Sequence, residues 1–315
     1  MIAFTSDYGH ADEFVGVCKA VMLGLAPDAR VVDLGHDVPA HDVRAGALLL
    51  VRAVQYLPED CIVLAVVDPG VGTERRLIGV EVAGGVLLGP DNGLLAPAVA
   101  MAGGARRVIS LDNAEYHLPA PGPTFAGRDV LSPAAGHLAA GVDLGDLGTP
   151  VDPATLVPGL VSLPEVRDDG TIVGEVWWVD RFGNAQLNID PGELQVAGCS
   201  LGSRVEVHVR AAGSGSGSGP AEHIRVARWV TTYAEAKPSE LVMLVDSYGL
   251  LALCLDRASA ADELGLRAGS GVTLVPEGAG GSTGAGGSTG AGGSTGATDD
   301  SSVETAVELS RRGDR

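Results

Sequence analysis

The order of apolar and helical segments constrains the fold of this chain most. From residue 2 to about residue 147, short apolar runs alternate with longer segments in which apolar residues recur with a helical period. This alternation is typical of an α/β domain with a largely parallel sheet flanked by helices. Strands are predicted at residues 2–6, 30–34, 61–67, 77–82 and 107–111, and helices at residues 12–25, 41–56 and 133–140.

A change of composition marks the second half of the chain. Between residues 145 and 164 the sequence is rich in Pro, Gly and Asp, which is typical of a linker. After it come β-rich runs at residues 171–180, 203–209, 240–245 and 272–275, with few helical segments between them. We therefore predict an α/β domain over residues 1–150, a linker over 151–165 and a smaller all-β, barrel-like domain over 166–277.

Two Gly-rich segments are predicted to lack fixed structure. Residues 213–220 form a Gly/Ser insert, interpreted as a flexible hairpin tip. From residue 278 the unit Ala-Gly-Gly-Ser-Thr-Gly recurs up to Ala297. Such a sequence buries too little apolar surface to offset its ordering entropy, so residues 278–315 are predicted to be a disordered Gly/Ser/Thr-rich tail.

Charge and cysteine content exclude several classes of function. A formal net charge of -19 argues against binding to nucleic acid or to anionic membranes. No signal-peptide pattern and no apolar stretch of the roughly 20 residues that span a bilayer is found, so a cytoplasmic protein is expected. The four cysteines are far apart in the sequence, which predicts buried reduced thiols and neither a metal site nor a disulfide framework.

Two carboxylates follow predicted parallel strands. Asp7 comes after the first strand and Asp68 after the third. Either one alone could be a helix cap or a turn residue. Ligands of open α/β sheets bind beyond the carboxyl ends of the strands, where two acidic residues would accept hydrogen bonds from ribose hydroxyls and repel phosphates. The pair therefore favours a nucleoside without phosphates.

The glycines near Asp68 do not form a phosphate-binding loop. Gly70-Val71-Gly72 resembles the start of a dinucleotide motif, but Arg75 stands where the third glycine should be. No phosphate-binding lysine follows either. We exclude a Rossmann phosphate site and a P-loop on these grounds.

Five motifs occur in a characteristic order. They are Thr5-Ser6-Asp7-Tyr8-Gly9, Asp68-Pro69-Gly70-Val71-Gly72-Thr73-Glu74-Arg75-Arg76, Pro90-Asp91-Asn92-Gly93-Leu94, Thr124-Phe125-Ala126-Gly127-Arg128-Asp129 and Asp180-Arg181-Phe182-Gly183-Asn184. Together they resemble the signatures of the S-adenosyl-L-methionine hydroxide adenosyltransferases, which share a fold with the fluorinase and the chlorinase. The resemblance covers about residues 1–277. It implies hydrolysis of S-adenosyl-L-methionine (SAM) to adenosine and L-methionine, with SAM as substrate and no metal or other cofactor.

The resemblance also assigns substrate contacts. It implies that Asp7 holds the ribose hydroxyls, that Asp180 binds the methionine ammonium and that Ser247 binds the methionine carboxylate. It further implies that the adenine is enclosed by Phe182, Asn184 and Tyr233. As alternatives, both aromatic residues are ordinary core residues and residues 182–184 are only a hairpin turn. The family places this site between the first domain of one subunit and the second domain of its neighbour, which implies a homotrimer.

The expected chemistry is an in-line displacement. A sulfonium is a good leaving group, so attack on the ribose C5′ carbon needs mainly a positioned water and a base. The resemblance assigns this water to Asp68 and Arg75, with Arg75 keeping Asp68 ionised and oriented. The alternative is a plain surface ion pair of little consequence.

One member of the expected catalytic set is absent. The family sequence Thr-Phe-His-Gly-Arg-Asp has Ala126 at the histidine position. We therefore expect impaired hydrolysis and retained binding, and we expect nearby His137 to be structural. A non-catalytic SAM- or adenosine-binding protein is an alternative that Ala126 favours. A SAM-dependent halogenase is disfavoured, because Asp68 would repel a halide and residues 82–90 lack the long insertion of the fluorinase.

Overall fold

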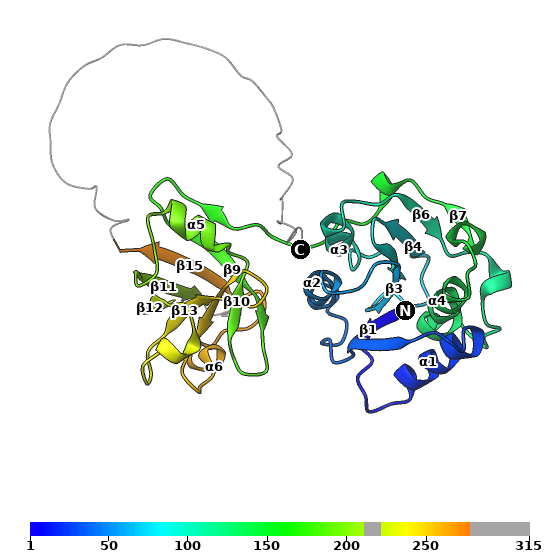
Figure 1. Cartoon of the computed structure of the whole chain (residues 1–315), viewed down its shortest axis with the longest axis horizontal. Helices are drawn as coiled ribbons and strands as arrows, with labels where there is room; N and C mark the ends of the chain where they lie inside the picture. Colours follow the sequence, from blue (N-terminus) through cyan, green and yellow to red (C-terminus); the bar gives the residue numbers. More distant parts are fainter. Residues whose placement is uncertain (211–221, 278–315) are drawn as a thin grey trace, which may run out of the picture.

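Long apolar runs dictate the centre of the first sheet. Strands β1 (Ile2–Ser6) and β3 (Cys61–Val66) are buried at every residue, as expected of neighbouring strands with both faces covered. The computed structural model describes residues 1–210 and 222–277, which form two units, each built on its own sheet (Figure 1). The predicted hairpin tip at 213–220 and the predicted tail at 278–315 lie outside the described residues.

The first sheet is mixed. Its order is β2-β1-β3-β5-β4-β6-β7, in which β2, β1, β3 and β5 run parallel and β4, β6 and β7 continue the sheet in antiparallel pairs. The remaining strands are β2 (Val31–Gly35), β4 (Leu77–Val82), β5 (Gly85–Pro90), β6 (Arg107–Ser110) and β7 (Thr149–Pro150). The α/β class is confirmed, and the antiparallel half of the sheet arises because β4 and β5 form a hairpin.

Strand β5 was not predicted from the sequence. Its first residue, Gly85, has φ 145°, and a Cβ there would lie 2.1 Å from the carbonyl oxygen of Cys61 on β3. Only glycine permits this close approach. The short run Gly-Val-Leu-Leu-Gly-Pro carries little strand signal, so its pairing depends on this contact with a distant strand.

Helices cover both faces of the first sheet. One face packs against α1 (Phe14–Leu25) and α4 (Ser132–Ala139), and the other packs against α2 (Val43–Val54) and α3 (Ala96–Met101). The side chain of Asp42 caps α2 by accepting a hydrogen bond from the amide of Ala45 at 2.9 Å. The three longer helices agree with the predicted segments, and α3 was not predicted.

The second unit is a closed barrel of seven strands in the order β10-β14-β13-β12-β11-β15-β9, closed by pairing of β9 with β10. Its strands are β9 (Ile172–Val179), β10 (Ala185–Leu187), β11 (Arg204–Arg210), β12 (Glu222–Trp229), β13 (Val242–Val245), β14 (Leu251–Cys254) and β15 (Gly271–Pro276). The two-residue strand β8 (Glu165–Val166) pairs with β9, and the helices α5 (Pro191–Val196) and α6 (Ala260–Leu264) accompany the barrel. The predicted barrel-like domain is confirmed.

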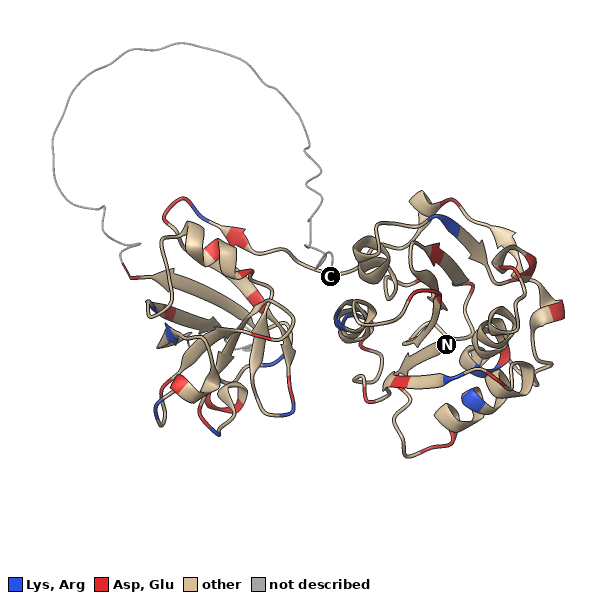
Figure 2. Ribbon diagram, in the orientation of Figure 1, with Lys and Arg blue, Asp and Glu red and all other residues tan. Residues whose placement is uncertain are grey.

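The barrel is filled by its own apolar side chains, which include Ile172, Val176, Leu187, Val205, Val207, Met243, Leu253 and Val272. Ligands therefore have to bind at its rim or its outer surface. Figure 2 shows acidic residues spread over both units rather than gathered in one field. All four cysteines are free and buried, as predicted. No helix in the described part of the chain is long and apolar enough to cross a membrane.

Candidate active site

Asp7 and Asp68 lie at the same edge of the first sheet. The register pairs Ser6 with Val66 in the parallel strands β1 and β3, and the amide of Asp7 donates to the carbonyl of Val66 at 3.2 Å. The half-buried Asp7 carboxylate accepts a hydrogen bond from the amide of His41 at 2.9 Å. His41 has φ 66°, a left-handed conformation that costs free energy for a non-glycine residue. The structure thus places the two carboxylates where the strand order predicts them.

Asp68 forms a buried bidentate pair with Arg75. The Nε atom of Arg75 donates to the two carboxylate oxygens of Asp68 at 2.9 and 3.0 Å, and its Nη2 atom donates to Oδ2. The Asp68 side chain is 6% exposed and that of Arg75 is 15% exposed. The pair is therefore not an exposed surface pair, because burial removes most of the water that would weaken it.

Position 126 lies beside this pair. Ala126 precedes the π-helical turn Gly127–Leu131, and it shares with Arg75 a cavity of about 410 Å³ that is also lined by Thr73 and His117. His137 lies outside this lining and packs edge-on against Tyr116, with ring centroids 4.9 Å apart. The structure therefore brings Ala126 and Arg75 together, and it gives His137 a packing role.

Tyr8 and His117 are two residues near Ala126 that were not predicted from the sequence as site residues. A Cβ at Gly127 would lie 2.1 Å from the hydroxyl oxygen of Tyr8, so the phenol reaches the chain directly after Ala126. Burial, with smaller contributions from Cys18, Asp7 and Asp68, raises the pKa of Tyr8, which stays a hydrogen-bond donor at neutral pH. His117 lines the cavity while its Nε2 atom contacts the carbonyl oxygen of Leu111 at 3.1 Å. Neither residue stands out in the sequence pattern, apart from the place of Tyr8 in a motif.

The turn between β9 and β10 is organised by Asp180. One carboxylate oxygen accepts hydrogen bonds from the amides of Phe182 and Asn184 at 2.8 and 2.9 Å, and the other accepts from Nδ2 of Asn184 at 2.8 Å. Gly183 has φ 83°, and a Cβ there would lie 2.1 Å from Oγ of Ser259. Residues 182–184 do form a hairpin turn, and this turn holds Asn184 at the rim of the barrel.

The two aromatic residues predicted to enclose the adenine are not core residues. Phe182 is 72% exposed and Tyr233 is 47% exposed. Two exposed rings on one rim are available to contact a ligand or another chain. The alternative that these rings belong to the core is therefore wrong.

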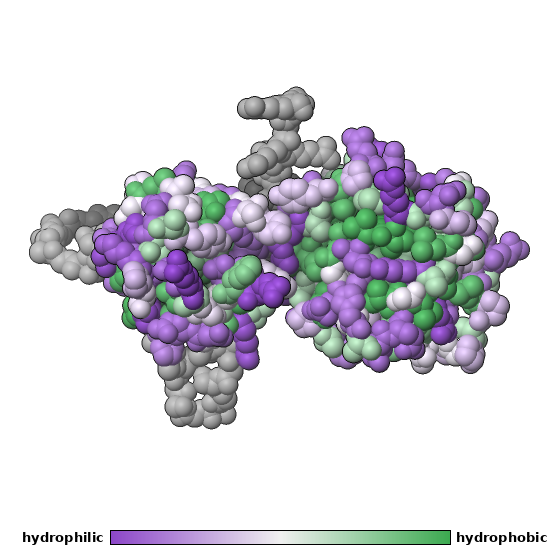
Figure 3. Space-filling model, turned by 60° about the horizontal axis from the view of Figure 1, so that its bottom comes forward, coloured by the Kyte–Doolittle hydropathy of each residue, from purple (hydrophilic) through white to green (hydrophobic). Residues whose placement is uncertain are grey.

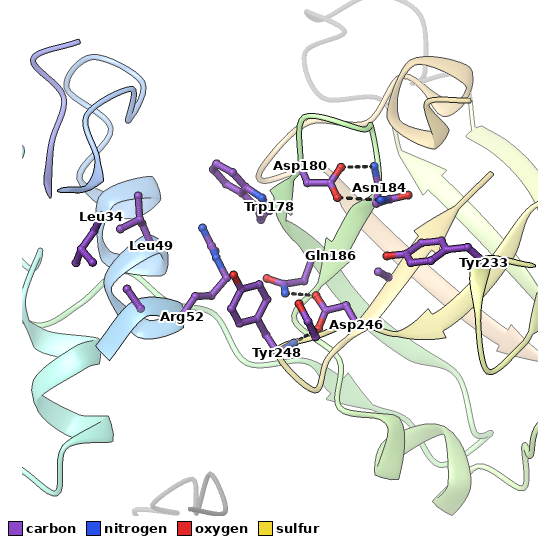
Figure 4. Close-up of a pocket in the computed structure, with 13 residues that line it drawn as sticks. Leu34, Leu49, Arg52, Trp178, Asp180, Asn184, Gln186, Tyr233, Asp246 and Tyr248 are labelled. Atoms are coloured by element: carbon purple, nitrogen blue, oxygen red, sulfur yellow. Dashed lines mark hydrogen bonds between the residues drawn. The ribbon is translucent and has the colours of Figure 1, made fainter. Parts of the chain in front are cut away.

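A second cavity of about 370 Å³ lies between the barrel and helix α2 (Figure 4). Four of the predicted binding residues line it: Asp180, Asn184, Tyr233 and Ser247. Phe182 is not part of this lining. Residues not anticipated from sequence complete it, namely Leu34, Leu49, Arg52, Ala53, Trp178, Gln186, Asp246, Tyr248 and Ala252.

The predicted site residues thus form two groups. The first group comprises Asp7, Asp68, Arg75 and Ala126, and none of them lines the cavity beside the barrel. The second group comprises Asp180, Phe182, Asn184, Tyr233 and Ser247, and none of them lines the cavity at Arg75. Within residues 1–210 and 222–277, no hydrogen bond or ion pair joins the two groups. The same residues contain no cluster of three or more His, Cys, Asp or Glu side chains suited to hold a metal.

Sequence comparisons match both units. Profiles of the SAM hydroxide adenosyltransferase N-terminal and C-terminal domains match residues 2–148 and 174–273. The (R)-S-adenosyl-L-methionine hydrolase of Salinispora tropica is 42% identical over 268 residues, which cover 85% of this chain and 95% of that protein. The enzyme of the same name from Thermus thermophilus is 38% identical over 281 residues, covering 87% of this chain and 99% of its own length. A fluorinase from an Actinoplanes species is 28% identical over 299 residues, covering 87% of this chain and 97% of the relative.

Solved structures share the fold. An uncharacterized conserved protein from Thermotoga maritima aligns with a TM-score of 0.79 at 29% identity, covering 87% of this chain and all (100%) of the other. A conserved hypothetical protein from Thermus thermophilus aligns with a TM-score of 0.65 at 35% identity, covering 87% and 99% of the two chains.

Proposed function

The chain belongs to the SAM hydroxide adenosyltransferase family, and from this we propose that it hydrolyses SAM to adenosine and L-methionine. Relatives with 38% to 42% identity carry the name (R)-S-adenosyl-L-methionine hydrolase, which supports this reaction. Within the molecule, the observation that carries the proposal is the buried Asp68–Arg75 pair at the ligand-binding edge of the first sheet. An oriented carboxylate at that edge is suited to activate a water molecule.

In the proposed reaction, Asp68 removes a proton from a water molecule while the oxygen of that water bonds to the ribose C5′ carbon. The bond from C5′ to sulfur breaks, and its electron pair neutralises the sulfonium to give the thioether of methionine. Arg75 fixes the orientation of Asp68 through three hydrogen bonds. The absence of an imidazole at Ala126 removes a further group that would hold the water, so we expect binding to survive better than turnover.

For substrate binding, we propose that Asp7 accepts hydrogen bonds from the ribose hydroxyls and that Asp180 meets the methionine ammonium. A carboxylate offers about four lone-pair sites, and Asp180 already accepts three hydrogen bonds, so one site remains. Ser247 is proposed to contact the methionine carboxylate. Adenine is proposed to contact the exposed ring of Tyr233 and the side chains of Phe182 and Asn184.

We further propose a homotrimer in which each site combines the first group of one chain with the second group of its neighbour. The separation of the two groups within one chain supports this arrangement. Figure 3 shows an apolar area on the first unit, a type of surface that subunit contacts commonly cover. The exposed ring of Phe182 is suited to close a site on a neighbouring chain. The cytoplasmic location expected from composition remains a prediction.

The decisive experiment incubates the purified chain with the R and S sulfonium epimers of SAM separately and identifies the products by chromatography. We expect adenosine and methionine in equal amounts from one epimer, and much less of both from an Asp68→Asn variant. The competing function is binding without catalysis, which Ala126 favours. Tight binding of SAM with no adenosine released over many hours, by the parent chain and by Ala126→His alike, would establish that competitor.

A further inference from the structure

The cavity beside the barrel contains a guanidinium without a counter-ion. Arg52 extends from helix α2 and is 9% exposed. Its Nη1 atom is buried without a hydrogen-bond partner, and no carboxylate in the described part of the chain forms an ion pair with it. The guanidinium lies 4.5 Å from the ring centre of Trp178 and 5.8 Å from that of Tyr248, and Asp246 acts on it electrostatically without forming an ion pair. A buried charge in this state is costly unless a ligand pairs with it.

Gln186, which lines the same cavity, carries an acceptor without a partner. The Oε1 atom of the buried Gln186 also lacks a hydrogen-bond partner. Figure 4 shows Arg52 reaching from α2 toward Trp178, Gln186 and Tyr248 of the barrel. Two residues that line the cavity therefore hold one buried donor group and one buried acceptor without a protein partner, a state more typical of a ligand site than of a fully packed interface.

Both carboxylates that line the cavity accept hydrogen bonds within the barrel, and Asp180 keeps one acceptor site free. Asp246 accepts hydrogen bonds from the amides of Tyr248 and Leu250 at 2.8 and 3.2 Å, and its other oxygen accepts from Nε2 of Gln186. Asp180 is held by its own turn. Among the described residues that line this cavity, only Arg52 is a cation, and it forms no ion pair with either carboxylate.

These groups fit an α-amino acid. Its ammonium can approach Asp180, and its carboxylate can accept two parallel hydrogen bonds from the planar guanidinium of Arg52. We propose that Arg52 binds the carboxylate of the methionine portion of SAM and makes the site selective for substrates that keep this carboxylate. The inference rests on the proposed function and adds to the contact of Ser247, since a hydroxyl supplies no charge.

Arg52 and the barrel residues that line this cavity belong to the same chain. In the proposed trimer, the ribose end of the substrate would contact the neighbouring chain, while the carboxylate end would be held by both units of one chain. The competing explanation is that Arg52 only packs α2 against Trp178 by a cation–π contact. If Arg52 binds the carboxylate, its loss should weaken only ligands that carry a carboxylate. If Arg52 only packs α2 against the barrel, its loss should affect all ligands alike.

The test measures, by titration calorimetry, the binding of three ligands: SAM, decarboxylated SAM, which lacks the carboxylate, and adenosine. The wild-type chain should bind SAM about 10- to 100-fold more tightly than the decarboxylated form, the factor expected of a charged hydrogen bond. Arg52→Met should remove this preference by weakening only SAM. Arg52→Lys should restore part of it, since it keeps the charge but loses the planar fork. Arg257→Met, at a highly exposed arginine, is the matched control and should change nothing.

The outcomes separate the explanations. Equal weakening of all three ligands by Arg52→Met, or a fall of melting temperature without a change of preference, would leave Arg52 with only a packing role. A wild-type chain that binds SAM and decarboxylated SAM equally well would overturn this inference and leave the proposed function intact. A wild-type chain that binds neither SAM nor adenosine would overturn both.

Discussion

Individual side chains around Asp68 determine what chemistry the first unit can perform. Burial turns an Asp–Arg pair that would be weak on a surface into a fixed arrangement of charge. The same neighbourhood contains the small residues Ala126 and Gly127, and the phenol of Tyr8 lies close to Gly127. Small changes of side-chain volume here should therefore affect either turnover or stability, depending on the position.

Ala126→His tests the catalytic importance of position 126. A single acid–base group typically contributes about 100- to 10,000-fold, so single-turnover release of adenosine at saturating SAM should accelerate strongly. Asp68→Asn on this background should abolish most of the gain, because the base is lost. If the parent chain and Ala126→His react at the same rate, position 126 has no catalytic role.

Gly127→Ala tests the close approach of Tyr8. The added Cβ would lie 2.1 Å from the hydroxyl oxygen, so Tyr8 has to move. Overpacking of this kind costs about 1–3 kcal/mol, which thermal unfolding would report as a lower melting temperature. Tyr8→Phe should recover part of the loss in the double variant. Gly16→Ala on helix α1, where the Cβ meets open space, is the matched control and should stabilise by up to about 1 kcal/mol.

Loops that carry site residues are attached to the secondary structure by ionic contacts. Arg228 on β12 donates from Nε and Nη2 to the carboxylate of Glu240 at 2.8 and 2.9 Å, and from Nη2 to the carbonyl of Glu235 at 2.8 Å. Tyr233 lies in the short 3₁₀ helix Tyr233–Glu235 of the same loop. The position of this ring at the rim of the cavity thus depends on an ion pair of the barrel.

The stability that Glu240 gives to this loop should depend on pH. Hydrogen bonds from Arg228 and from the amide of Lys237 lower the pKa of Glu240 to about 2, from an ordinary value of 4.5. A lowered pKa stabilises the folded state above the ordinary value, and the effect is lost as pH falls toward the folded value. At pH 7 the wild-type chain should therefore have a higher melting temperature than Glu240→Gln. This gap in melting temperature should close between pH 4.5 and about 2. A gap that is constant with pH would exclude this linkage; the exposed Glu165→Gln should show little difference at any pH.

The whole molecule consists of two units with separate cores, and we propose residues 1–150 and 166–277 as the limits of the two domains. Each domain carries one group of site residues and neither carries a complete set. A complete site therefore requires either a large movement within one chain or association of chains. The exposed rings of Phe182 and Tyr233 favour association, since they have no partner surface in their own core.

The proposed assembly predicts a particle of three times the 31.8 kDa chain in light scattering, with or without ligand. Complementation tests where the sites lie: Asp7→Ala and Asp180→Ala should each bind SAM poorly alone. The trimers obtained by co-expression, mixed and unmixed together, should recover binding at roughly a quarter of their sites, because each site takes one residue from each of two chains and each of these residues is intact in half of the chains. A monomer mass, or no recovery in the mixed protein, would contradict intersubunit sites.

Local patterns in the sequence predicted the two sheets, the three longer helices and the edge at which Asp7 and Asp68 meet. These features are predictable because the apolar period and the residues that follow a strand depend on neighbouring residues. The motifs that contain Asp68 and Asp180 likewise identified the turns in which these carboxylates lie. Strand β5, with the hairpin it forms, and helix α3 were missed, since short runs acquire their structure from distant partners.

Only the tertiary structure decided which side chains are buried and which of them meet. It buried most of the Asp68 and Arg75 side chains, left Phe182 and Tyr233 exposed, and separated the two groups of site residues. It also brought Arg52 of helix α2 against Trp178 of the barrel. The physical reason is that burial, charge pairing and cavity shape arise from packing between segments far apart in the chain, and no local pattern of residues encodes that packing.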